Sequence, residues 1–214
     1  MPEYIVKQGD YLAKIAREQG FYDYLVIWDH AQNAELKSKR QNPNILYPND
    51  SLYIPDKELK EESGVTEQRH KFKVKIRPLK LKIILKDLYF KPLSNKECVL
   101  HVDGEEFKLT SQANGLVEQD IPSTAQQARI LIKDNNSPIT LEVPIQIGHL
   151  DPTDAVSGQK ARLNNLGYFA GPLDEEDEAA FTSAVEEFQC DHKLTVDGKC
   201  GPNTQAKLRE VHGC

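Results

Sequence analysis

The spacing of apolar residues changes twice along this chain of 214 residues, and that change constrains the fold more than any other feature. Up to about Pro55, apolar residues recur at helical intervals between two short β-forming runs. From about Phe72 to Ile147 they alternate with polar residues, which is the period of a strand. After His149 the helical interval returns. The pattern predicts a multidomain α+β chain.

Four parts follow from these intervals. Residues 1–56 are expected to form a βααβ module, 57–71 a polar linker, 72–149 a small all-β sandwich and 150–214 a three-helix bundle. In the first part, a strand at Tyr4–Lys7 and a last strand at Ser51–Pro55 are expected to pair in antiparallel fashion. Between them we expect one helix after Asp10 and a second from Tyr24 onward.

Both ends of the first part resemble the LysM family, at Tyr4–Ala16 and at Asn44–Pro55. Two features differ from that family: Tyr11 replaces its usual Thr, and the stretch Trp28–Asn42 is longer than usual. The resemblance implies recognition of N-acetylglucosamine-containing glycans such as peptidoglycan or chitin. It places the ligand between two loops, whose residues here are Gly9, Asp10, Tyr11, Leu12, Asn44, Ile45 and Leu46.

The chemistry of these loops suits a neutral acetamido sugar. Such a ligand offers an amide, several hydroxyls and a methyl group, so its site needs backbone donors and acceptors beside a small apolar patch. Gly9 would allow close backbone approach, and the patch would come from Tyr11, Ile45 and Leu46. The alternative is that Ile45 and Leu46 only close the core and that Asp10 only caps a helix.

The middle part is expected to hold six or seven short strands, with turns at Asp103-Gly104 and Asn114-Gly115. It loosely resembles the transthyretin-like or carboxypeptidase-regulatory sandwich, which implies a spacer or protein-contact module without catalysis. Basic residues recur at every second position from Lys71 to Arg77. A solvated strand face explains this spacing better than a nucleic-acid patch does.

The last part resembles the three-helix peptidoglycan-binding domain that is appended to cell-wall hydrolases. The resemblance lies in the loops Gly167–Asp174 and Leu194–Thr204, with Phe188-Gln189 between them. It implies a second wall-binding surface at Tyr168, Phe169, Phe188, Asp197, Gly198 and Gly201. The acidic run Asp174–Glu178 departs from the family and would repel a wall that carries carboxylates. A bundle that docks onto protein is the alternative.

Four cysteines are present, and none has the spacing of a zinc site. Three of them, Cys190, Cys200 and Cys214, fall in the last 25 residues. In an oxidising compartment a disulfide between Cys200 and Cys214 is the favoured pairing, and reduced thiols are the alternative. We expect no metal and no cofactor.

The composition of the chain argues against two classes of partner, nucleic acids and membranes. A net charge of −6 argues against nucleic-acid binding, and no apolar run approaches the ~20 residues of a membrane span. The N-terminus carries no secretory signal, so we expect synthesis in the cytoplasm and, for action at the cell wall or periplasm, export by a non-classical route.

The two glycan modules predict a bivalent, non-catalytic peptidoglycan-binding protein that anchors or targets a partner to the bacterial cell wall. The combination resembles phage baseplate and type VI secretion accessory proteins, which implies a secreted effector, spike or baseplate protein as partner. We expect no enzymatic activity. The alternative is a cytoplasmic adaptor or chaperone-like protein whose modules bind protein.

Overall fold

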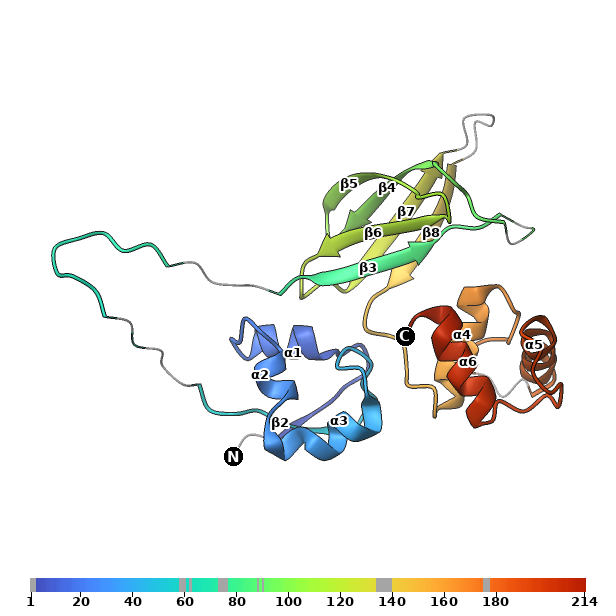
Figure 1. Cartoon of the computed structure of the whole chain (residues 1–214), viewed down its shortest axis with the longest axis horizontal. Helices are drawn as coiled ribbons and strands as arrows, with labels where there is room; N and C mark the ends of the chain where they lie inside the picture. The colour runs from blue at the N-terminus through green and yellow to red at the C-terminus, as the bar shows by residue number, and fades with distance from the viewer. Residues whose placement is uncertain are drawn as a thin grey trace.

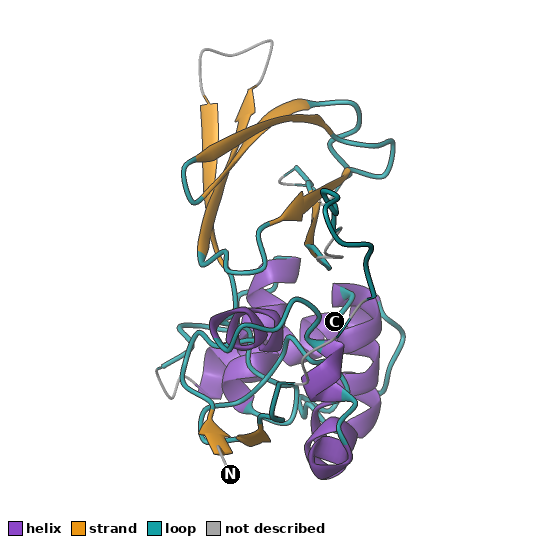
Figure 2. Cartoon of the chain, turned by 90° about the vertical axis from the view of Figure 1, so that its left-hand side faces the viewer, coloured by secondary structure: helices purple, strands orange, loops and turns teal. Residues whose placement is uncertain are grey.

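The computed structural model describes residues 3–57, 61, 63–72, 77–87, 89, 91–133, 140–174 and 178–214. Its helices and antiparallel sheets confirm the mixed α+β class. In the described part, buried apolar side chains gather in three clusters, centred on Leu12, Leu100 and Phe188. Figure 2 shows the strands of the sandwich at one end of the molecule and most of the helices at the other.

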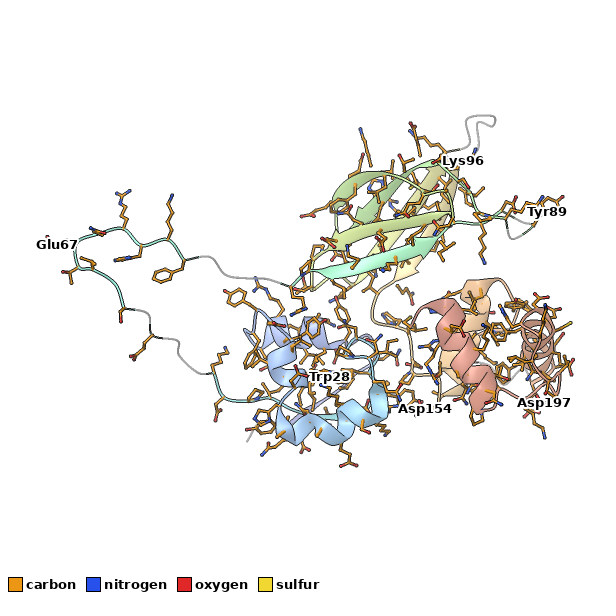
Figure 3. All side chains as sticks on the ribbon, viewed as in Figure 1. Trp28, Glu67, Tyr89, Lys96, Asp154 and Asp197 are labelled. Carbon is orange, nitrogen blue, oxygen red and sulfur yellow. The ribbon has the colours of Figure 1, made fainter. Side chains whose placement is uncertain are left out.

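The amino-terminal module is built on a two-stranded antiparallel sheet. Strand β1 (Glu3–Ile5) pairs with β2 (Ser51–Tyr53), and Tyr4 lies opposite Leu52. Helix α1 (Leu12–Glu18) buries the stripe formed by Leu12, Ile15 and Ala16, which is the i, i+3, i+4 spacing of one helix face. Trp28 lies within this module (Figure 3) and belongs to the same core.

The second helix expected from Tyr24 onward is present but ends at Trp28, and a further turn and helix follow it. The structure has α2 (Leu25–Trp28), a 3₁₀ turn (Ala31–Asn33) and α3 (Ala34–Arg40). The cause is the buried amide of Asn33, which donates to the carbonyls of Ile27 and Tyr53 at 2.8 Å and accepts from the N–H of Tyr53. These bonds tie the turn to β2 and interrupt the helix.

The middle part is a sandwich of two sheets (Figure 1). One sheet pairs β3 (Leu79–Ile84) with β6 (Leu116–Ile121). The other has the order β5-β4-β7-β8 and comprises β4 (Glu97–Val102), β5 (Glu105–Thr110), β7 (Gln127–Lys133) and β8 (Thr140–Gln146). Leu100, Val117 and Ile130 are buried between the sheets.

Lysines of β3 are paired with acids of β6. Lys80 lies 2.8 Å from Asp120, and Lys82 lies 2.9 Å from Glu118. These positions face solvent, so the two lysines belong to a solvated, charge-paired strand face. Residues 73–76 of the expected basic alternation lie outside the described residues.

Three helices form the carboxy-terminal domain: α4 (Val156–Leu166), α5 (Glu178–Asp191) and α6 (Pro202–His212). Leu163, Val185, Phe188 and Leu208 fill its core. Helix α4 ends at Gly167, whose φ of 96° places it in the left-handed region that suits glycine at a helix end. Residues 175–177 of the acidic run lie outside the described residues.

The predicted Cys200–Cys214 disulfide is wrong. The two residues lie at opposite ends of α6, and eleven helical residues span roughly 16 Å. A disulfide needs Cα atoms about 4.4–6.8 Å apart. All four cysteines are free, with Cys98 buried in the sandwich and Cys190 exposed.

In the portion of the chain that the structure describes, no helix has both the length and the apolar surface needed to cross a bilayer. The same portion contains no group of three or more His, Cys, Asp or Glu side chains placed to hold a metal ion.

Candidate functional site

An open, largely apolar hollow of about 480 Å³ lies on the carboxy-terminal domain, between the end of α4 and the loop that follows it. Its lining comes from Asn164, Gly167, Tyr168, Phe169, Gly171 and Pro172. The ring of Phe169 is 75% exposed, which is unusual for a phenylalanine in a folded domain. An exposed ring above an apolar hollow is a surface that can receive a ligand.

The loop behind this hollow is held by one side chain of α4. The amide of Asn164 accepts from the N–H of Ala170 at 2.8 Å and donates to the carbonyl of Gly171 at 2.9 Å. Lys160 donates to the carbonyl of Pro172 at 3.1 Å from a buried position. The base of the loop is therefore fixed while Phe169 projects from it.

Of the two aromatic residues Tyr168 and Phe188, only Tyr168 lies at the hollow. Phe188 is completely buried, so the prediction that it touches the wall is wrong. Its ring packs edge-on against Tyr168, with centroids 5.5 Å apart. The hydroxyl of Tyr168 donates to Asp191 at 2.9 Å, and burial together with this bond raises its pKa. Phe188 thus positions Tyr168, which does line the hollow.

The second predicted loop is organised by Gln189, a residue of α5 that is 1% exposed. Its amide nitrogen donates to the carboxylate of Asp197, the carbonyl of Lys199 and the hydroxyl of Thr204, at 2.8–3.0 Å. Its amide oxygen accepts from the N–H groups of Asp197 and Gly198. Asp197 is therefore a turn-forming acceptor, and with Gly198 and Gly201 it lies outside the hollow. In Figure 3, Asp197 lies away from the amino-terminal module.

Sequence reasoning did not assign Gln189 or Asn164 to the site. The signal for Gln189 is a polar residue on a buried helix stripe, since Val185, Phe188 and Gln189 share one face of α5. A buried amide on such a stripe needs partners, and the nearby loop supplies them.

The amino-terminal loops expected to bind glycan are packed within the molecule. Asp10 is 6% exposed and accepts from the Tyr4 hydroxyl, the Lys7 N–H and the Lys14 ammonium at 2.8–3.2 Å. Burial raises the pKa of Asp10, but these three bonds and the charge of Lys14 outweigh it and hold the pKa below its usual value. The Asp10 carboxylate therefore stabilises the folded module through these bonds.

Tyr11 is 1% exposed and donates from its hydroxyl to the carbonyl of Ala125 in the sandwich. A Cβ built on Gly148 would lie 2.6 Å from the Tyr11 ring, and one built on Gly9 would lie 3.2 Å from the imidazole of His149. The segment after β8 therefore lies against this loop. The predicted sugar contact by the Tyr11 side chain is wrong.

The remaining predicted residues are also engaged. Leu12 and Leu46 are buried in the module's own core, as the alternative for Leu46 expected, so the Leu46 side chain does not form an exposed apolar patch for a ligand. The amide oxygen of Asn44 accepts from the N–H of Ala13 at 3.2 Å. Ile45 is 7% exposed and borders a cleft that faces the carboxy-terminal domain.

Comparison with known protein families gives one finding for this chain: residues 153–208 match the model of a putative peptidoglycan binding domain. The match runs from just before α4 into α6 and contains the hollow beside Phe169. It confirms the prediction of a peptidoglycan-binding domain in the carboxy-terminal part. No curated protein and no solved structure matches the chain. The resemblance of the first part to LysM stays a prediction.

Proposed function

We propose that this chain binds bacterial peptidoglycan without cleaving it, through the hollow beside Phe169 on its carboxy-terminal domain. The observation that carries the proposal is the match of residues 153–208 to a peptidoglycan-binding family, because these residues include the whole lining of the hollow. The cell wall is therefore the proposed place of action.

The surface of the hollow suits an acetylated sugar. The exposed ring of Phe169 and the ring of Pro172 offer apolar faces for the C–H face and acetyl methyl group of the sugar. Gly167 and Gly171, both with positive φ, keep side chains away from the floor, so a glycan can approach the main chain closely.

Binding without hydrolysis agrees with the roles of the polar side chains there. Asn164 is engaged by loop backbone groups, and Tyr168 by Asp191. A general acid and base would instead need two titratable groups aimed at the place where the scissile bond lies. The proposal includes no cofactor.

The amino-terminal module and the sandwich are proposed to present the binding domain and to hold a partner at the wall. Support comes from the contacts that join the three parts: Tyr11 to Ala125, and Arg40 to Asp154 at 3.1 Å. That the partner is a secreted effector, spike or baseplate protein, exported by a non-classical route, rests on the resemblance alone.

One observation favours the second candidate, an adaptor whose modules bind protein. The loop Gly9–Leu12 lies against polypeptide, namely residues 125, 148 and 149 of this same chain. For the amino-terminal module this contact supports a structural role. It does not bear on the hollow at Phe169.

Co-sedimentation with purified insoluble peptidoglycan tests the proposal. The variant is Phe169→Ala and the matched control is Phe72→Ala, since these two phenylalanines are 75% and 74% exposed. We expect Phe169→Ala to weaken binding about tenfold, the usual effect of removing a central aromatic contact, and Phe72→Ala to leave it unchanged.

Two results would contradict the proposal. One is the absence of wild-type protein from the pellet, and the other is an equal effect of both substitutions. The non-catalytic part is tested in the same reactions, where we expect no release of reducing ends or soluble muropeptides.

A further inference from the structure

A second cleft, more enclosed than the hollow at Phe169, lies where the amino-terminal module faces the carboxy-terminal domain. Residues 39–42 and 45 line one side, and residues 152–154 together with α6 line the other. Figure 1 shows α3 and α6 on either side of the segment that connects the sandwich to α4. The cleft measures about 640 Å³, within the usual size of small-ligand sites.

Positive charge dominates the lining. Its cationic side chains are Lys39, Arg40, Arg162 and Arg209, and its acidic ones are Asp154 and Glu210. The chain as a whole carries a net charge of −6, so this local excess runs against the global balance. A cleft lined by one sign of charge concentrates ligands of the opposite sign.

The acidic residues at the cleft already have partners. Arg40 is nearly fully buried and makes two bonds to Asp50, at 2.7 and 2.8 Å, and its Nη1 lies 3.1 Å from Asp154. In Figure 3, Asp154 lies between the two modules. Glu210 lies 2.8 Å from Lys207 on the same helix. Neither acid is left to neutralise the other cations of the cleft.

Arg209 and Arg162 supply the remaining charge. Arg209 donates to the hydroxyl of Thr153 at 2.6 Å, and no carboxylate of the described residues lies within ion-pair distance of it. Arg162 is 1% exposed and donates to the main-chain oxygens of Asp151, Gly158 and Cys214 at 2.7–2.9 Å. Burial lowers the pKa of Arg162, and the charge of Arg209 lowers it further against the opposing effects of Cys214 and Asp151.

We infer that this cleft binds a carboxylate of the peptide stem of peptidoglycan. Guanidinium groups hold planar carboxylates with paired hydrogen bonds, and the exposed ammonium of Lys39, which lies 3.9 Å from Asp50, adds a third donor at the rim. The side chains of Gln41, Asn42 and Gln205 also line the cleft, and amides suit the peptide groups next to such a carboxylate.

This inference rests on the proposed function and extends it. Phe169 would hold the sugar strand and the cleft would hold the attached peptide, so the chain would distinguish a wall with stems from a bare glycan. The amino-terminal module then contributes to recognition through Lys39 and Arg40.

The test compares two wall preparations, intact peptidoglycan and peptidoglycan from which an amidase has removed the stem peptides. The variant is Arg209→Gln, and the control is Arg69→Gln, the same change in charge at an exposed position outside the cleft. Loss of one charged contact is expected to weaken binding to intact wall about fivefold. Binding to stripped wall should be the same for all three proteins.

Lys39→Gln provides a second variant in case Arg209→Gln does not fold, because the Lys39 side chain is 58% exposed. Lys39→Gln should also weaken binding to intact wall. Raising the salt concentration should reduce the difference in affinity between this variant and wild type. If both variants bind intact wall as wild type does, while wild type still binds, the inference is overturned and the proposed function stands. If wild type binds neither preparation, both are overturned.

Discussion

The hydroxyl of Tyr11 donates a 2.5 Å hydrogen bond to the carbonyl of Ala125, which lies 114 residues further along the chain. The ring of Tyr11 also belongs to the apolar cluster of the sandwich and not to the core of its own module. A residue expected to meet a sugar therefore joins two parts of the molecule, and this contact can be tested by stability measurements.

Replacing Tyr11 should destabilise the fold in two steps. Tyr11→Phe leaves the Ala125 carbonyl without its partner and should cost about 1–2 kcal/mol of unfolding free energy. Tyr11→Ala also removes a fully buried ring and should cost about 3–5 kcal/mol. Urea unfolding measures both values. As a control, Tyr22→Ala changes a ring that is 49% exposed and should cost much less. Equal losses for Tyr11→Ala and Tyr22→Ala would show that the contact does not join the modules.

The space around Gly148 is too small for any side chain. Its φ is +82°, and an added Cβ would lie 2.6 Å from the Tyr11 ring and 2.8 Å from the Gly9 carbonyl oxygen. Gly104 has a similar φ of +94° but open space around it, so Gly104→Ala should cost only the left-handed strain of about 1 kcal/mol. Gly148→Ala should cost about 2 kcal/mol more, because the segment and the loop must separate. Thermal melting of both variants gives the difference, and similar melting temperatures would contradict the close approach.

Gln189 should be required for the loop before α6. Gln189→Leu keeps most of the volume but leaves the N–H groups of Asp197 and Gly198 without their acceptor. We expect a loss of about 3 kcal/mol, and faster amide exchange at these two N–H groups. Gln119→Leu, at a partly exposed strand position, is the control and should have little effect. Unchanged exchange in the Gln189 variant would show that the loop is held by other contacts.

His212 should make stability depend on pH in the mildly acidic range. Burial lowers its folded-state pKa from 6.5 to about 4, and the charge of Arg162 contributes. Between those two values the unfolded chain binds more protons than the folded one, so the free energy of unfolding falls as the pH is lowered from 6.5 toward 4. The full effect is roughly 2–3 kcal/mol.

Urea unfolding at several pH values tests this dependence. His212→Gln does not titrate and should flatten the slope between pH 6.5 and 4, whereas His70→Gln, in the exposed linker, should keep the slope of the wild type. A slope that survives in the His212 variant would assign the effect to other groups.

The sequence predicted correctly those structural features that depend on residues close together along the chain. The helical interval after His149 and the loop expected from Gly167 predicted a helix that ends there, as α4 does, because helix spacing and a left-handed cap are local properties. The peptidoglycan-binding domain was also identified, since its loops resemble those of a known family. The structure places Tyr168 and Phe169 at a hollow, and their contact with the wall stays a prediction.

The sequence did not predict features that depend on contacts between residues far apart along the chain. The burial of Tyr11 is decided by residues 125 and 148, and no pattern beside Tyr11 encodes them. The amide of Asn33 interrupts a helix because β2 offers it partners twenty residues later. The disulfide prediction relied on closeness in sequence, whereas the rigid helix α6 keeps Cys200 and Cys214 apart.

The central claim is that peptidoglycan is bound by the carboxy-terminal domain, and an NMR titration of the full-length chain with soluble muropeptides tests it most directly. We predict that backbone amide signals of Tyr168, Phe169 and the loop up to Leu173 shift with added ligand, while those of Gly9–Leu12 stay in place. The account would be contradicted if the amide signals of Gly9–Leu12 and Asn44–Leu46 shifted while those of the loop around Phe169 did not.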